Sequence, residues 1–287
     1  MILSRLKPDP IPAIDPVPEY RVTGRRAELY AQTKATLQVP WMGVITMALA
    51  SYETYYEALW AAVGPMMETR EAVDACARLR GEIEAEVAAL SPLPMADRLA
   101  ELGYAPREVE GIREAVEVFS HGNFPYTLIV TLSRLALEAE RFAAEVPGTP
   151  FAGRHAPDVA VPFVLMEDHH ADAPLRAVYA DIRERLGLPF VNTDYRALGR
   201  WPSYFAEAWG ALAPHVQTQE YEAMVARLHH RFVEEAMALP NPTGATAARL
   251  REAASSAPPG EILEVTRLFQ WLLPGLCTNV AFFRAQL

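Results

Sequence analysis

The chain has 287 residues, 51% of them apolar, with a charged fraction of 22% and a formal net charge of −10. This composition excludes wholesale disorder and allows one large domain or two of ordinary size. No basic run exceeds Arg25-Arg26, which argues against nucleic acid as a partner. Cys76 and Cys277 form neither a CxxC motif nor a disulfide framework. No apolar run suits a signal peptide or a membrane span, so we expect a cytoplasmic protein without membrane association.

The sequence repeats itself after 149 residues. Residues 30–90 align without a gap on residues 179–239, with 18 identities in 61 positions, where chance gives roughly 4. The matches include Trp60 with Trp209, Pro40 with Pro189 and Pro65 with Pro214. We therefore predict an extended, proline-rich arm over residues 1–24, a first repeat over 25–145, a Pro/Gly-rich linker over 146–173 and a second repeat over 174–287.

Each repeat is predicted to be helical. Apolar residues recur at helical spacing in both copies, and Pro106 and the Pro258-Pro259-Gly260 segment are typical of helix starts. No long segment alternates with period two. We predict an all-α fold of about five helices per copy, with the two tandem repeats packed as an intrachain pseudo-dimer around an approximate two-fold axis.

Where the two copies are aligned, a polar residue in one copy whose counterpart in the other copy is apolar is a candidate for function. Asp194 is the clearest case, because Ile45 is its counterpart, and it follows Leu188-Pro189-Phe190 at an expected helix start. One interpretation is a helix cap, which Asn192 or Thr193 would equally provide. The other is a carboxylate held in a groove between the repeats.

Asn123 is the second case. The segment His121-Gly122-Asn123-Phe124-Pro125-Tyr126 interrupts an apolar run, whereas the second copy has Trp271-Leu272-Leu273-Pro274 there. An ordinary turn or helix cap explains this pattern. Alternatively, the amide binds a buried water or a carboxylate, and Asn123 and Asp194 both face one central cavity.

Three other clusters favour structural roles. The segment Glu167-Asp168-His169-His170-Ala171-Asp172 lacks the spacing of a metal site and is expected to be a solvated loop. His229 and His230 are neighbours that point apart on a helix. The counterparts of Glu53 and Glu57 in the second copy are Pro202 and Ala206, so these two glutamates are also candidates. A solvent-exposed helix surface explains them best. The sequence contains no Gly-rich phosphate loop, GxSxG or HExxH motif.

The motifs around these candidates resemble the group I 2-haloacid dehalogenases over about residues 25–285. The segments that carry the resemblance are Leu37-Gln38-Val39-Pro40-Trp41, His121-Gly122-Asn123-Phe124-Pro125-Tyr126, and Asp194 with Leu198, Trp201 and Pro202. The resemblance implies an all-helical pseudo-dimer that hydrolyses 2-halocarboxylic acids without a cofactor. The lack of any well-spaced set of ligand residues predicts that no metal is needed. The resemblance also implies that Asp194 activates a water which attacks C2 directly, with inversion and without an ester intermediate, while Asn123 helps to hold that water.

The expected substrate and halide contacts come from both copies. They are Trp41, Val44, Tyr126, Asn192, Thr193 and Trp271. Val44 stands where the family often has an aromatic residue, and Trp271 where it has a tyrosine. Asn192 is bulky where copy one has Gly43, so we predict selectivity for one enantiomer, taken as D.

Two other interpretations stay open from the sequence. One is a non-catalytic or small-molecule-binding helical protein on the same scaffold. The repeat is also similar to the carboxymuconolactone decarboxylase and alkylhydroperoxidase D-like superfamily, whose peroxidase chemistry needs a CxxC that is missing here. A homodimer is likewise left open.

Overall fold

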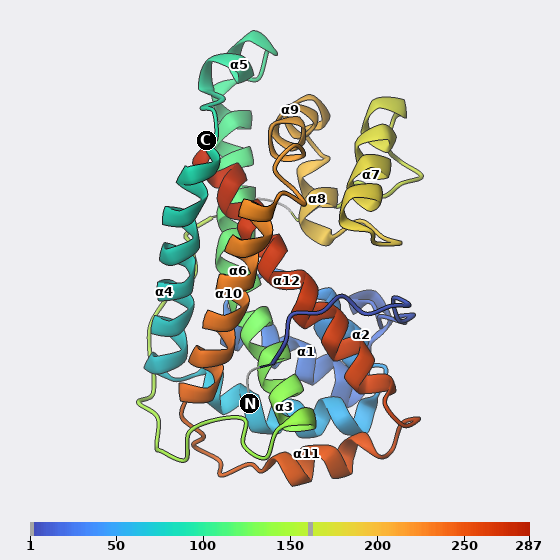
Figure 1. The fold of residues 1–287 in the computed structure, drawn as a ribbon, viewed down its shortest axis with the longest axis vertical. Helices are drawn as coiled ribbons and strands as arrows, with labels where there is room; N and C mark the ends of the chain where they lie inside the picture. The colour runs from blue at the N-terminus through green and yellow to red at the C-terminus, as the bar shows by residue number, and fades with distance from the viewer. Residues whose placement is uncertain (1–2, 160–162) are drawn as a thin grey trace. The chain divides into compact units, whose positions relative to one another are not determined.

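The computed structural model describes residues 3–159 and 163–287, and these residues are helical or irregular, with no strand longer than an isolated bridge. The all-α prediction is thus confirmed. Among these residues there are six α-helices per copy rather than about five (Figure 1). None of the helices described here combines the length and the apolar character that a bilayer span requires.

The helices of the two copies occur in the same order. Copy one contains α1 (Gly24–Leu37), α2 (Val44–Leu49), α3 (Glu53–Met67), α4 (Arg70–Glu86), α5 (Ala96–Glu101) and α6 (Pro106–Glu138), with the 3₁₀ turn η2 (Val87–Leu90). The 3₁₀ turn η1 (Glu19–Arg21) lies in the N-terminal arm. Copy two contains α7 (Ala173–Leu186), α8 (Thr193–Leu198), α9 (Pro202–Leu212), α10 (Gln219–Ala238), α11 (Ala247–Ala254) and α12 (Glu261–Ala285). The first four helices of each copy begin 149 residues apart, which is the offset of the sequence similarity.

Helices α1 and α7 end in the same way with different residues. The C-cap of α7 is Gly187, at φ 60°, where a residue without a Cβ adopts the left-handed conformation easily. Its counterpart after α1 is Gln38, at φ 52°. The Gln38 side chain compensates by long-range bonds, because its Nε2 donates to the Gly153 carbonyl at 2.8 Å and its Oε1 accepts from the His155 N–H at 2.9 Å.

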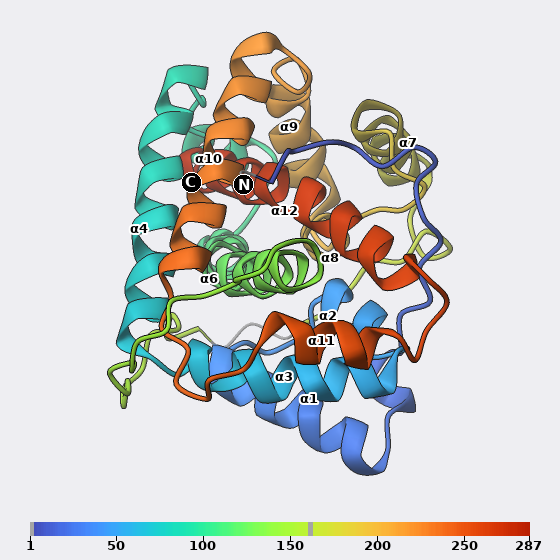
Figure 2. The same ribbon diagram turned by 60° about the horizontal axis from the view of Figure 1, so that its bottom comes forward.

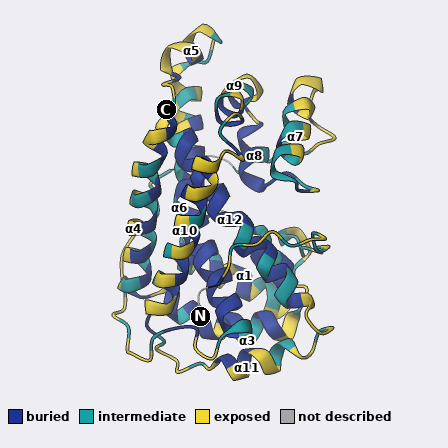
Figure 3. Cartoon of the chain, viewed as in Figure 1, coloured by how far each residue is buried: buried dark blue, intermediate teal, exposed yellow. Residues whose placement is uncertain are grey.

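Helices α6 and α12 are the longest of each copy, and each contains a proline. Pro125 lies inside α6 and Pro274 inside α12, also 149 residues apart. The expectation that residues 121–126 form a turn or a helix start is therefore wrong: Asn123 lies in the middle of a continuous helix. Burial explains the difference, because most of α6 after Ile112 is buried (Figure 3), and packing outweighs the local preference of Gly-Asn-Phe-Pro for a turn.

Two compact units divide the chain differently from the sequence repeats. Unit 1 consists of the chain up to Leu79 with Gly122–Ala156 and Ala226–Gly275. Unit 2 consists of Arg80–His121, Pro157–Val225 and Leu276–Leu287. Each unit therefore joins the first three helices of one copy to parts of the long helices of both copies, while the repeat boundaries remain a prediction from sequence similarity.

Unit 1 is built around α3. Helices α1 and α11 both pack on α3, as Figure 2 shows, and α2 contacts it as well. The N-terminal arm is attached to this unit: the Val17 N–H donates to the Met47 carbonyl at 3.0 Å, and the Glu19 carboxylate accepts from the Met42 N–H at 2.9 Å. The arm thereby holds both α2 and the segment that precedes it.

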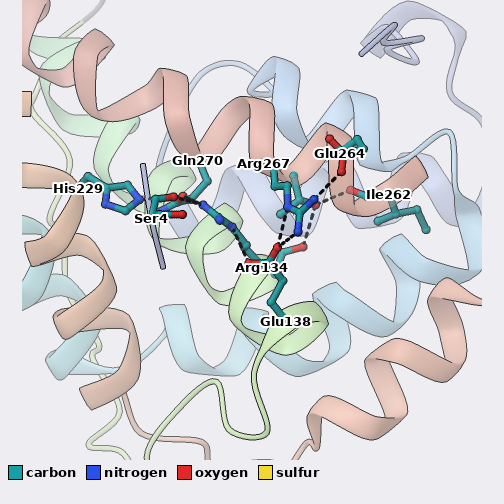
Figure 4. Close-up of polar contacts among 10 residues, drawn as sticks. Ser4, Arg134, Glu138, His229, Ile262, Glu264, Arg267 and Gln270 are labelled. Carbon is teal, nitrogen blue, oxygen red and sulfur yellow. Dashed lines mark hydrogen bonds and ion pairs between the residues drawn. The ribbon is translucent and has the colours of Figure 1, made fainter. Parts of the chain in front are cut away.

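A buried polar network crosses unit 1 (Figure 4). The Arg134 guanidinium donates to Gln270 Oε1 at 2.5 Å and to the Glu138 carboxylate at 3.0 Å. Because arginine can only donate, the amide oxygen of Gln270 faces it, and His229 Nε2, at 2.9 Å from the same oxygen, must carry a proton. Burial lowers the pKa of His229 to about 4, so this histidine is neutral at physiological pH.

His229 should make the fold sensitive to mild acid. An unfolded histidine titrates near pH 6.5, whereas folded His229 titrates near pH 4. The unfolded chain binds more protons between these values, so the free energy of unfolding should fall by about 1.4 kcal/mol per pH unit as pH drops through this window. Denaturant unfolding across the window should show that His229→Leu loses this part of the slope. The exposed neighbour variant His230→Gln is the control and should keep the slope; equal slopes for wild type and His229→Leu would contradict the assignment.

Candidate active site

Asp194 lies in the first turn of α8, in unit 2. The backbone of Asn192 caps this helix, since its carbonyl accepts from the Arg196 N–H at 3.2 Å. Asp194 is only 3% exposed. A carboxylate in the first turn is favoured by the helix dipole, so the local sequence Asn-Thr-Asp explains why the helix begins here. Burial of a charged group is costly, which makes a purely structural cap an expensive solution.

The side chain of Asn192 does not act as a cap. It makes no capping hydrogen bond, although the residue occupies the N-cap position. Its Oδ1 is buried and has no hydrogen-bond partner, and the residue is 7% exposed. A buried amide oxygen without a partner costs free energy and is uncommon in folded proteins. The capping interpretation of this side chain is therefore wrong, and its amide oxygen is buried without a hydrogen-bond partner two residues before Asp194.

Thr193 completes the start of α8. Its Oγ1 accepts a long hydrogen bond from Arg196 Nη2, at 3.4 Å. Because the guanidinium supplies the proton of that bond, the hydroxyl proton of Thr193 can be donated to another acceptor. Arg196 is itself held by Glu167 at 2.6 Å. Thr193, Asn192 and Asp194 thus present three buried polar side chains at one helix start.

The candidates in unit 1 gather where α6 meets the segment before α2. The Tyr126 hydroxyl donates to the Trp41 carbonyl at 2.6 Å, and the two rings lie 5.8 Å apart. Burial raises the pKa of Tyr126 well above its usual range, so the phenol stays neutral. Since its proton is used by Trp41, Tyr126 contributes its ring rather than a hydroxyl donor to any ligand.

Gly122 allows the Trp41 indole to lie directly against α6. A Cβ built at Gly122 would overlap the six-membered part of the Trp41 ring. Asn123, the next residue, is 4% exposed, and its carbonyl accepts from the Thr127 hydroxyl at 2.7 Å. A buried asparagine thus directly follows, in the sequence, the glycine against which the Trp41 indole packs.

Val44 and Trp271 occupy different surroundings. Val44 is the first residue of α2 and is half-buried. Trp271 lies in α12 under the N-terminal arm, with Arg5 5.6 Å and Lys7 5.4 Å from its ring, and its carbonyl accepts from Arg5 Nε at 3.2 Å. The ring contacts found for Trp271 are with these cations, so its role in substrate binding stays a prediction.

The weaker candidates have structural partners. Glu53 pairs with Arg26 at 3.2 Å and Glu57 with Arg25 at 3.6 Å, all at the surface. In the acidic segment, Glu167 binds Arg196, Asp168 binds Arg183, and Asp172 caps α7 by accepting from the Leu175 N–H at 2.9 Å. Across residues 3–159 and 163–287, no three His, Cys, Asp or Glu side chains cluster as metal ligands would.

One buried network near Asp194 was not expected from the sequence. Asn279 in α12 donates to the Tyr195 hydroxyl at 2.8 Å and accepts from the Tyr221 hydroxyl at 2.6 Å. The comparison of the two copies contains a signal for this network. At the 149-residue offset, the counterparts of Asn279, Tyr195 and Tyr221 are Val130, Thr46 and Ala72, which could not form the same hydrogen-bonded network.

Residues 40–188 match the family described as halocarboxylic acid dehydrogenase DehI. The chain belongs to this family. It is 43% identical to the (R)-2-haloacid dehalogenase of Rhizobium sp. (strain NHG3), over 84% of this chain and 93% of that relative. It is 37% identical to the (R)-2-haloacid dehalogenase of Pseudomonas putida, over 95% and 92% of the two chains. The resemblance to 2-haloacid dehalogenases drawn from the motifs is confirmed.

The fold of the family extends over the whole chain. A solved structure of a D-2-haloacid dehalogenase mutant in complex with D-2-CPA covers 96% of both chains with a TM-score of 0.85 and 34% identity. The roles of Asp194, Asn123 and the expected substrate contacts remain predictions.

Gly122 should tolerate no larger residue. In Gly122→Ala the new methyl group meets the Trp41 ring, so the indole or the α6 backbone must shift; we expect a loss of about 1–3 kcal/mol in the free energy of unfolding. Gly81→Ala is the matched control, because a Cβ there meets nothing within 4 Å. Placed inside α4, it should be neutral or stabilising by up to about 1 kcal/mol. Denaturant unfolding of both variants measures the difference, and equal stabilities would show that Trp41 does not press on Gly122.

Proposed function

We propose that this protein hydrolyses 2-halocarboxylic acids to 2-hydroxy acids and prefers the (R), or D, enantiomer. The observation that carries the proposal is Asp194, a buried carboxylate at a helix start whose counterpart in copy one is Ile45. Membership of the family and the names of the relatives support the substrate class. A hydride transfer, which the word dehydrogenase would suggest, normally uses a Gly-rich dinucleotide loop, and the sequence contains none.

The reaction needs a nucleophile in line with the carbon–halogen bond. Asp194 takes a proton from a water, whose oxygen bonds to C2 while the bond to the halogen breaks and its electron pair leaves with the halide. The products are the 2-hydroxy acid, the halide and a proton. Attack opposite the leaving group inverts C2. No ester with Asp194 forms, because the carboxylate acts as a base and not as the nucleophile.

The other side chains hold the reactants. Asn123 binds the water with its amide. The family resemblance assigns substrate and halide contacts to Trp41. In unit 2, Arg196 donates to Thr193 Oγ1, so the hydroxyl proton of Thr193 can be donated to the departing halide. Tyr126 supports Trp41 through its carbonyl. The same resemblance assigns substrate contacts to Val44 and Trp271.

Replacement of the base should abolish turnover. Asp194→Asn keeps the size of the side chain but cannot accept the proton of the water, so we expect halide release to fall by about 10²-fold or more. Halide release from (R)-2-chloropropionate by ion chromatography measures this, with circular dichroism to show that the helical content is kept. Glu53→Gln, at the surface, is the control and should stay near wild type. Activity of Asp194→Asn within about tenfold of wild type would sink the assignment.

Asn192 should set the preference for one enantiomer. Its amide oxygen is buried without a partner beside Asp194, where copy one has Gly43, so the side chain occupies space near C2 rather than capping the helix. A misfit of one methyl group costs about 1–3 kcal/mol, which corresponds to about 10–200-fold. We expect wild type to favour (R)-2-chloropropionate by such a factor in kcat/KM, and Asn192→Ala to reduce it. Equal kcat/KM values for the two enantiomers in wild type would disprove this role.

A further inference from the structure

We propose that Asn279 is a positioning residue for Asp194. It holds the neighbouring Tyr195 through the hydrogen-bonded chain Tyr221–Asn279–Tyr195, and thereby fixes the direction of the Asp194 carboxylate. The inference rests on the proposed function of Asp194 as the general base. All four residues belong to unit 2, so the argument uses contacts within one compact body.

Asp194 needs such support because α8 has only six residues. A helix of this length is not stable alone, and its position is decided by tertiary contacts. Tyr195 provides such contacts. It is fully buried, and its ring centroid lies 5.8 Å from that of Trp209 and 6.0 Å from that of Phe205. Its backbone adjoins Asp194, so a shift of the Tyr195 ring moves the carboxylate.

Asn279 uses both ends of its amide to bridge the two tyrosine hydroxyls. Its Oδ1 can only accept, so the Tyr221 hydroxyl at 2.6 Å must donate to it. The amide Nδ2 then faces the Tyr195 hydroxyl at 2.8 Å and donates. All three residues are buried, where hydrogen bonds are strong and a lost partner is costly. The chain therefore locks the hydroxyl end of Tyr195, while the aromatic contacts locate its ring.

Helix α2, the counterpart of α8 in the first copy, lacks this network of hydrogen bonds. Thr46 stands at the position of Tyr195, and its hydroxyl donates to the Gly43 carbonyl of its own helix start at 2.7 Å. Val130 and Ala72 stand where Asn279 and Tyr221 stand. In copy one the short helix carries Ile45, and the side chains of Val130 and Ala72 have no polar group to offer Thr46. The long-range polar chain is present in the copy that carries the carboxylate.

Positioning and mere structural support predict different kinetics. Asn279→Leu removes the donor to Tyr195, and a displacement near 1 Å at a catalytic group can cost about 100-fold. We expect kcat for (R)-2-chloropropionate to fall at least about tenfold while KM changes less than about threefold, because a general base acts in the transition state and contributes little to ground-state binding. The control is Tyr30→Phe, which lies outside this hydrogen-bonded network. It also removes a tyrosine hydroxyl, which donates to the Val17 carbonyl in a partly buried bond, and it should keep the wild-type kcat.

A triple variant separates stability from catalysis and guards against a single variant that does not fold. Tyr195→Phe, Asn279→Leu and Tyr221→Phe together leave none of the three polar groups of this chain buried without its partner, so the free energy of unfolding should recover toward wild type. Its kcat should stay low, because the ring of residue 195 then has no hydroxyl through which a hydrogen bond could hold it. Denaturant unfolding and halide release are measured on the same samples.

Three outcomes would overturn the inference: a kcat of Asn279→Leu within about threefold of wild type, an effect on KM alone, or a triple variant that regains both stability and kcat. Failure of the proposed function looks different. If Asp194→Asn retains activity, Asp194 is not the base, whatever the Asn279 variants do. If Asp194→Asn is inactive and Asn279→Leu is fully active, the proposed function stands and only the positioning role is lost.

Discussion

Helix α8 is only six residues long, and everything expected of the Asp194 carboxylate depends on how this helix is held. So short a helix has too few internal hydrogen bonds to persist alone. Its C-terminal side is fixed by Arg196, whose carbonyl accepts from the Met166 N–H at 2.9 Å and whose guanidinium binds Glu167. Its N-terminal side is fixed by the burial of Tyr195. The carboxylate is therefore placed by groups distant in sequence.

The internal duplication explains where chemistry could arise without loss of the fold. The first four helices of each copy begin 149 residues apart, so the residues at equivalent positions of these helices can be compared directly. Three consecutive positions of α8 and its cap, namely Asn192, Thr193 and Asp194, are polar where copy one has Gly43, Val44 and Ile45. Copy one keeps the apolar solution that stabilises a core, while copy two carries the buried polar groups, whose cost must be offset by other contacts.

Close packing of the Trp41 indole on α6 is the corresponding constraint in unit 1. A glycine inside a helix lowers its stability by about 1 kcal/mol relative to alanine, and Pro125 removes a backbone donor from the same stretch. Both are tolerated in α6 because Gly122 gives room for the Trp41 ring and because the helix is buried along this stretch. Helix α6 thus contains two residues that disfavour a helix, Gly122 and Pro125, in the stretch that carries Asn123.

The sequence by itself determined the helical class, the repeat offset and the family, because periodicity, self-similarity and the motifs around Trp41, Asn123 and Asp194 are local or pairwise properties of the chain. It also located Asp194 at a helix start, since capping depends on a few adjacent residues. Only the tertiary structure decided that residues 121–126 are helical, because burial outweighs the turn preference of Gly, Asn and Pro. It alone showed that the Asn192 amide oxygen has no partner and that Asn279 reaches Tyr195 across 84 residues. Hydrogen bonds between distant segments depend on how helices pack, and no local pattern encodes that.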